Sequence, residues 1–209
     1  MFENALGAQF RRFENREYLG KPARVVVAVR TYDTDREDLW HALTSRERIP
    51  RWFLPIEGDL KLGGRYQLKG NAGGTITRCE APSALDLTWE FGGGMSWVTV
   101  RLQPEGQRTQ LTLEHIVHTS DLDAHWARFG PGAVGIGWDL SLFGLGKYLE
   151  GGGAPVDHEA AHAWMASEAG KTFMRTSGNA WADAHIEGGE KPEVARAMAA
   201  ETIKFYTGG

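Results

Sequence analysis

The chain has 209 residues, of which 42% are hydrophobic and 24% are charged, a composition typical of a globular protein with one sizeable core. Its formal net charge is −4 and its 23 basic residues form no sustained run, so we expect neither nucleic acid nor a membrane surface as a partner. No apolar run reaches the roughly 18 residues that a membrane-spanning helix needs. Residues 1–20 lack the apolar core of a signal peptide, and the single cysteine, Cys79, cannot form an intrachain disulfide. The sequence therefore predicts a cytoplasmic protein.

The first predicted elements are one strand and two short helices. Ala23–Tyr32 is rich in β-branched residues that alternate between two faces, which is typical of a strand. Thr34 and Glu37 have the spacing of a capping box, and the same spacing recurs at Thr44 and Glu47. Each box precedes apolar residues at helical intervals, so the sequence predicts two helices in tandem, the second ending near Trp52 and Phe53.

From residue 58 to residue 118 the chain reads as an antiparallel meander. Short segments are separated by glycine and proline turns, and in the clearest of them Leu85, Leu87, Trp89 and Phe91 alternate with polar residues. The following segments show the same alternation, with Trp97 out of phase with Val98 and with His115 in phase with Leu113. The pattern predicts a sheet with one apolar face, which must be covered.

A buried helix is predicted within Gly132–Gly151. Trp138, Leu142, Leu145 and Leu149 fall on one helical stripe, and most of the remaining circumference is apolar too. This helix is too short to span a bilayer, so we expect it to cover the apolar face of the sheet. Gly144 and Gly146 lie inside it at a cost of about 1 kcal/mol each relative to alanine. They indicate either a close contact with the sheet or space for a ligand.

The last third of the chain is predicted to be helical, over residues 157–187 and 192–206. It contains the pattern HEAAH at residues 158–162, which places His158 and His162 on one helix face, as in zinc hydrolases, with Glu159 as a general base. The third ligand would have to be Glu187 or His185. Two solvated histidines are the simpler interpretation, and we assign no metal.

Several segments resemble the homologues of the activator of heat-shock protein 90 ATPase, a family of the START-like (Bet v-like, SRPBCC) superfamily. These segments, which run from about residue 25 to residue 151, are LWHALTSRERIPRWF, DLKLGGRYQL, GTITRCEAPSALDLTWEF, WVTVRLQPEGQRTQLTLEH and GIGWDLSLFGLGKYLEG. The resemblance implies an α+β helix-grip fold, in which an antiparallel sheet curls around a long C-terminal helix and two short helices follow strand one. The tail resembles that of a bacterial branch. The chaperone-activating role belongs to a eukaryotic branch with an extra N-terminal domain.

The predicted organisation is an N-terminal segment (1–22), a START-like helix-grip domain (23–153) and a helical C-terminal extension packed on the same domain (154–209). The resemblance implies a cavity between the sheet and the long helix that takes apolar molecules. The residues predicted to line it are Trp52, Phe53, Trp89, Phe91, Trp97, His115, Trp138 and Leu142. No catalytic motif and no cofactor are predicted.

Three individual residues invite a chemical interpretation. His115 could hydrogen-bond a ligand or act as an acid or base in a dry cavity, although a core histidine is the simpler interpretation. Asp139 could place a carboxylate at the end of the cavity, but near the start of a helix it more simply complements the helix dipole. A cysteine becomes a good nucleophile when its surroundings lower the pKa of its thiol, and nothing in the sequence would do so for Cys79.

Three functions remain open at this level. The leading prediction is binding of a small hydrophobic or aromatic molecule between sheet and helix. The alternatives are a co-chaperone-like protein-interaction module and a zinc-dependent hydrolase that uses HEAAH. A homodimer is a further arrangement that the sequence leaves open.

Overall fold

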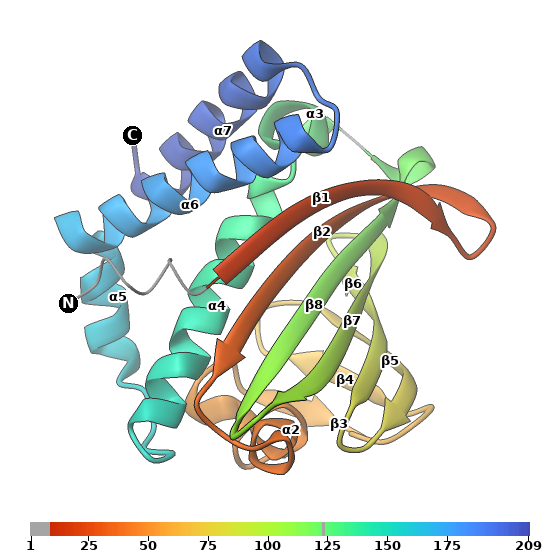
Figure 1. The fold of residues 1–209 in the computed structure, drawn as a ribbon, viewed down its shortest axis with the longest axis vertical. Helices are drawn as coiled ribbons and strands as arrows, with labels where there is room; N and C mark the ends of the chain where they lie inside the picture. Colours follow the sequence, from red (N-terminus) through yellow and green to blue (C-terminus); the bar gives the residue numbers. More distant parts are fainter. Residues whose placement is uncertain (1–8, 123) are drawn as a thin grey trace. The chain divides into compact units, whose positions relative to one another are not determined.

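A computed structural model describes residues 9–122 and 124–209, so the first eight residues of the predicted N-terminal segment lie outside it. Its strands form a curled eight-stranded sheet in the order β1-β2-β8-β7-β6-β5-β4-β3 (Figure 1). Every pair from β3–β4 to β7–β8 is antiparallel. The strands are β1 (Gln9–Tyr18), β2 (Lys21–Tyr32), β3 (Ile56–Gly58), β4 (Arg65–Leu68), β5 (Gly73–Glu80), β6 (Ala84–Phe91), β7 (Gly94–Glu105) and β8 (Arg108–His118).

The described chain also contains helices and short helical turns. They are α2 (Arg36–Thr44), the 3-10 turns η1 (Ile49–Arg51) and η2 (Thr119–Asp121), α3 (Ala124–Phe129), α4 (Gly132–Glu150), α5 (His158–Ala166), α6 (Glu168–Glu187) and α7 (Pro192–Thr207). None of the helices in the described ranges is long and apolar enough to cross a membrane. The predicted α+β helix-grip fold is confirmed, with two short helical elements after β2 and a long helix after the meander.

The chain divides into two compact units, each of which is built from separated segments. Of the described residues, the first unit consists of 9–28, 118–122, 124–140 and 157–209, and the second of 29–117 and 141–156. Three of these divisions fall within β2, β8 and α4, whereas the boundaries predicted from the sequence lie after residues 22 and 153. Two strands and one helix therefore contribute to both units.

In the first unit, β1 and the tail helices pack on the N-terminal half of α4. Glycines permit this close packing, because a Cβ on Gly135 would lie 2.4 Å from the Trp181 ring and one on Gly178 would lie 2.5 Å from Ile203. The α6 helix also contacts β1, where the Phe13 and His185 rings meet edge to face with centroids 4.6 Å apart.

In the second unit, the C-terminal half of α4 packs on the end of β2. The Tyr32 hydroxyl donates a hydrogen bond to the Leu142 carbonyl, at 2.9 Å, and Leu142 and Leu145 are buried. A further apolar cluster of buried residues, Tyr66, Leu68 and Ile76, lies on β4 and β5.

Several local predictions are wrong, and each has a physical cause. The first helix is capped by Asp35, whose carboxylate accepts from the Asp38 amide, rather than by Thr34. The second predicted helix is only the three-residue turn η1, which contains Pro50. Residues 157–187 form two helices, because the Ser167 side chain caps the start of α6 and breaks the segment there.

Candidate functional site

The apolar face of the sheet in the second unit is defined by the register of β6, β7 and β8. Leu85 on β6, Val100 on β7 and Leu113 on β8 lie opposite one another across the three strands. Leu87, Val98 and His115 do the same. Trp89 pairs with Ser96. Paired residues share a face, and alternate residues of a strand do too. We call this set, Leu85, Leu87, Trp89, Ser96, Val98, Val100, Leu113 and His115, the apolar face.

The β6 part of the apolar face is accessible to solvent. β6 is an interior strand, hydrogen-bonded to β5 and β7, yet Leu85, Leu87 and Trp89 are only partly buried. Ser96 is partly buried too, whereas the other paired positions on β7 and β8 are buried, with Val98 only 3% exposed. These apolar side chains belong to an interior strand, and they are therefore left within reach of another molecule.

His115 is the buried titratable group of the apolar face. Its Nε2 lies 2.9 Å from the Ser96 hydroxyl, and its ring meets the Trp89 ring edge-on with centroids 6.1 Å apart. Burial lowers the pKa of His115 to about 4, so the imidazole is neutral at physiological pH. A neutral imidazole beside a hydroxyl can exchange hydrogen bonds with a ligand without adding charge.

The two glycines of α4 face protein atoms. A Cβ on Gly146 would lie 3.1 Å from Nη2 of Arg30 and 3.7 Å from the Tyr32 ring, and one on Gly144 would lie 3.2 Å from the Trp52 carbonyl oxygen. The space beside these glycines is thus occupied by the guanidinium of Arg30 and by the turn that carries Trp52. Of the two explanations that the sequence offered for these glycines, the structure supports close packing and not space for a ligand.

Arg30 is buried without a counter-ion. The residue is 8% exposed, and its guanidinium carbon lies 5.4 Å from the centre of the Tyr32 ring. Its Nη1 is buried and has no hydrogen-bond partner, and no ion pair reaches it, within the residues that the structure describes. Burial raises the pKa of the Tyr32 phenol, and the positive charge of Arg30 opposes that rise.

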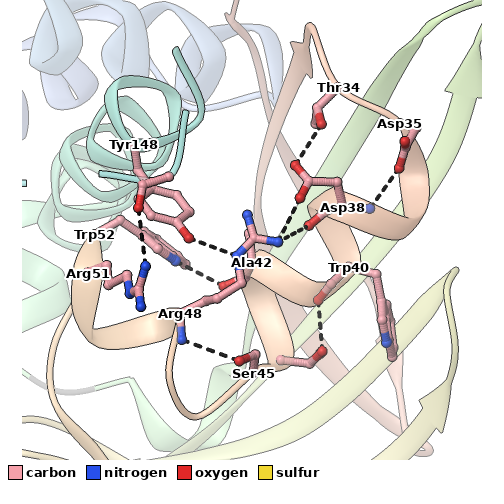
Figure 2. A network of polar contacts seen from close by, with 12 residues as sticks. Thr34, Asp35, Asp38, Trp40, Ala42, Ser45, Arg48, Arg51, Trp52 and Tyr148 are labelled. Atoms are coloured by element: carbon pink, nitrogen blue, oxygen red, sulfur yellow. Dashed lines mark hydrogen bonds and ion pairs between the residues drawn. The ribbon is translucent and has the colours of Figure 1, made fainter. Parts of the chain in front are cut away.

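A polar network joins α2, η1 and the last turns of α4 (Figure 2). Arg48 donates from Nε to the Tyr148 hydroxyl and from Nη1 to the Asp38 carboxylate, each at 2.7 Å, and Thr34 also donates to that carboxylate. Burial alone would raise the pKa of Asp38, but the hydrogen bonds from Arg48 and Thr34 lower it overall. The Asp38 carboxylate, Nε and Nη1 of Arg48 and the Tyr148 hydroxyl all have partners in this network, so it holds the helices in place.

Trp52 and Phe53 follow this network directly. The Trp52 indole donates to the Ala42 carbonyl at 2.9 Å, and the two rings are stacked with centroids 5.4 Å apart. Both side chains are partly buried, and Phe53 packs on the Tyr66 cluster together with Trp89. Phe53 and Trp89, two of the residues predicted to line a cavity, therefore pack against one cluster.

Other predicted lining residues do not join this set. Trp97 pairs with Thr88 and Ile116, which lie on the opposite face of the sheet from Trp89 and His115. Phe91 is 62% exposed at the end of β6. Trp138, which is partly buried, belongs to the first unit, whereas Leu142 is buried in the second.

The HEAAH segment forms α5 and its histidines are exposed. His158, Glu159 and His162 all face solvent. Across residues 9–122 and 124–209, no three His, Cys, Asp or Glu side chains lie close enough together to hold a metal ion. Nothing in the described chain supports the zinc hydrolase alternative.

Asp139 has a different role from the predicted one. α4 begins at Gly132, so Asp139 lies two turns inside the helix, where the dipole has little effect. Its fully buried carboxylate accepts hydrogen bonds from Arg11 and Trp181, at 2.8 and 3.2 Å, and also from Gln9 and Ser177. Burial raises the pKa of Asp139, which the Arg11 charge opposes. The residue therefore ties β1 and α6 to α4.

Sequence reasoning missed Arg30, Arg48 and Tyr148. One signal for Arg30 was available. It lies on the same side of the predicted strand as Val26 and Ala28, where an arginine is unusual. Arg48 and Tyr148 are 100 residues apart, and no local pattern links them.

The curled sheet, the helical turns after β2 and the long helix α4 define a helix-grip protein of the START-like superfamily. The chain belongs to the family of activator of Hsp90 ATPase homolog 1-like proteins, whose sequence model matches residues 33–150. That segment is more than half of the chain.

Solved structures extend the likeness beyond this segment. The crystal structure of CalU16 from Micromonospora echinospora is 31% identical, covers 85% of this chain and 98% of its own, and has a TM-score of 0.67. The solution NMR structure of CalU16 is 32% identical, covers 87% of this chain and 97% of its own, and has a TM-score of 0.71. DynU16, a protein in the dynemicin biosynthetic locus, shares the fold at 18% identity and a TM-score of 0.55, over 63% of this chain and 48% of its own. No protein with curated annotation matches the chain significantly.

Proposed function

We propose that this protein is a cytoplasmic binder of a small, mainly apolar or aromatic molecule, which lies on the apolar face. The observation that carries the proposal is the partial exposure of Leu85, Leu87 and Trp89 on an interior strand. Apolar groups on such a strand are normally covered, and a ligand that covers them gains the hydrophobic free energy that the fold leaves unused. The exposed, free thiol of Cys79 agrees with a reducing compartment.

The magnitude of this gain is sufficient for specific binding. Each 100 Å² of apolar surface removed from water contributes about 2.5 kcal/mol. A few hundred square ångströms, shared between ligand and protein, thus offsets the cost of association and leaves an affinity in roughly the micromolar range. Stacking on Trp89 or Phe53 would favour an aromatic ligand by about 1 kcal/mol more.

Polar groups at the same place would orient the ligand. Ser96 and the neutral His115 lie beside Trp89, and small-molecule sites are typically apolar surfaces with a few polar groups that fix orientation. The proposed site therefore consists of Phe53, Trp89 and His115 with the leucines of β6. Trp52 is a proposed neighbour, through its stacking on Phe53.

Binding is tested by native mass spectrometry and by tryptophan fluorescence against a library of apolar and aromatic compounds. We expect one-to-one complexes whose affinity falls at least tenfold in Trp89→Leu. Trp164→Leu is the matched control, because Trp164 lies in the first unit against Phe173. No complex with any compound, or equal loss in both variants, would refute the proposal.

A co-chaperone role is the second candidate, and the family match over residues 33–150 is the observation that favours it. It predicts that the purified protein changes the ATPase rate of an Hsp90-type chaperone. An unchanged rate and no complex in a pull-down with that chaperone would exclude this role.

A further inference from the structure

We propose that the ligand carries a carboxylate that pairs with Arg30. This inference rests on the proposed function and specifies its ligand class, an apolar acid. The observation behind it is a guanidinium that is buried between β2 and α4 with no counter-ion in the described chain.

The charge of Arg30 needs compensation that the described fold does not supply. An arginine side chain stays protonated and presents five N–H donors. Burying such a group without a partner is strongly unfavourable, and buried charges in proteins are normally paired. The Tyr32 ring attracts the positive charge through a cation–π contact. The ring does not, however, accept hydrogen bonds from the N–H groups, which point outward in the plane of the guanidinium.

The surroundings of Arg30 hold the guanidinium in place rather than neutralise it. Gly146 lets Nη2 approach the backbone of α4, where any larger residue would crowd it. The Tyr32 hydroxyl is already engaged with the Leu142 carbonyl, so it remains fixed beside the guanidinium. A positioned, unpaired cation of this kind is preorganised for an anion.

A carboxylate fits Arg30 better than a phosphate does. The planar guanidinium fork matches a carboxylate through two parallel hydrogen bonds, and one positive charge balances one negative charge. His115 stays neutral and adds no second charge for a phosphate dianion. β2 lies next to β8, the strand that carries Leu113 and His115. We therefore place the apolar body attached to the carboxylate along the apolar face.

A matched pair of probes tests the inference, decanoate and 1-decanol, both used below the micelle concentration of decanoate. We expect the wild type to bind decanoate about 10- to 100-fold more tightly than decanol, the range that a charge-assisted hydrogen bond gives. Arg30→Met should lose this preference and keep its affinity for decanol. Arg78→Met is the control, because Arg78 is partly exposed and pairs with Glu80.

The outcomes separate this inference from the proposed function. Equal binding of the two probes by the wild type, or a preference that survives in Arg30→Met, would overturn the pairing with Arg30 and leave ligand binding intact. Binding of neither probe, nor of any compound in the library, would overturn the proposed function and this inference with it.

Stability without ligand gives a second readout. Replacing an uncompensated buried charge by an apolar side chain of similar length should leave the Tm of ligand-free Arg30→Met equal to or above that of the wild type. Decanoate should then raise the Tm of the wild type and not that of the variant. A marked fall in the Tm of the ligand-free variant would show that the fold itself satisfies Arg30, and would contradict the inference.

Discussion

Asp139→Asn should destabilise the first unit strongly. The carboxylate of Asp139 is fully buried and accepts hydrogen bonds from four side chains, and the side chain of its ionic partner Arg11 is only 7% exposed. Removing one member of a buried ion pair leaves the other charge uncompensated, at a cost of about 3–5 kcal/mol. Asparagine keeps the shape and one acceptor, so we expect the lower end, about 3 kcal/mol.

The assay is thermal and denaturant unfolding, with Asp183→Asn as the matched control. Each kcal/mol lowers the Tm of a protein of this size by roughly 2–4 °C, so Asp139→Asn should lower it by about 6–12 °C. Asp183 pairs with Arg196 on the surface of the same unit, and an exposed pair contributes at most about 1 kcal/mol. Equal shifts for the two variants would refute the role of Asp139 as a buried anchor.

Three further predictions concern single residues of the fold. The pKa of His115 is about 4 in the folded protein and an ordinary 6.5 in the unfolded chain. On acidification, the imidazole is therefore protonated in the unfolded chain at a higher pH than in the folded protein. The stability contributed by neutral His115 is therefore complete above pH 6.5 and falls by roughly 2 kcal/mol by pH 5, a loss that His115→Gln should not show in denaturant titrations. Gly135→Ala should cost about 2 kcal/mol in chemical unfolding, because its Cβ would lie 2.4 Å from the buried Trp181 ring. Tyr148→Phe removes the acceptor for Arg48 Nε and should lower the free energy of unfolding by about 1 kcal/mol.

Controls and refuting outcomes follow from the same contacts. His158→Gln changes an exposed histidine and should keep the wild-type pH profile, so identical profiles for both histidine variants would contradict the burial argument. Gly137→Ala meets only the Tyr206 hydroxyl, at 3.2 Å, and should be near neutral; equal costs at the two glycines would argue against the Trp181 clash. An unchanged stability of Tyr148→Phe would show that the Arg48 bond contributes nothing.

The fold was predictable where local patterns carry it. The period of two predicts β6, β7 and β8, the apolar circumference predicts α4, and the structure confirms these four elements. Of the three strands, only β8 alternates in burial. β1 was not predicted, because its residues are mostly polar. Its buried residues Gln9 and Phe13 find partners in α4 and α6, more than 100 positions away.

The candidate site was predictable only in part. Alternation put Trp89 and His115 in phase with the apolar residues, and the register confirms that they share a face. The same alternation set Trp97 out of phase, and including it in the lining on account of its aromatic ring alone was not supported. Arg30 could not be identified as unpaired from the sequence, because pairing depends on which side chains approach it in the folded chain.

The central claim is that a ligand lies on the apolar face beside Trp89, and the indole N–H signals of the eight tryptophans in an NMR spectrum test it most directly. Titration with an apolar ligand found in the library should shift the Trp89 signal, and to a lesser extent that of Trp52, while the signal of Trp181, buried in the first unit, stays in place. Saturable shifts confined to tryptophans other than these two, with Trp89 unmoved, would contradict the account.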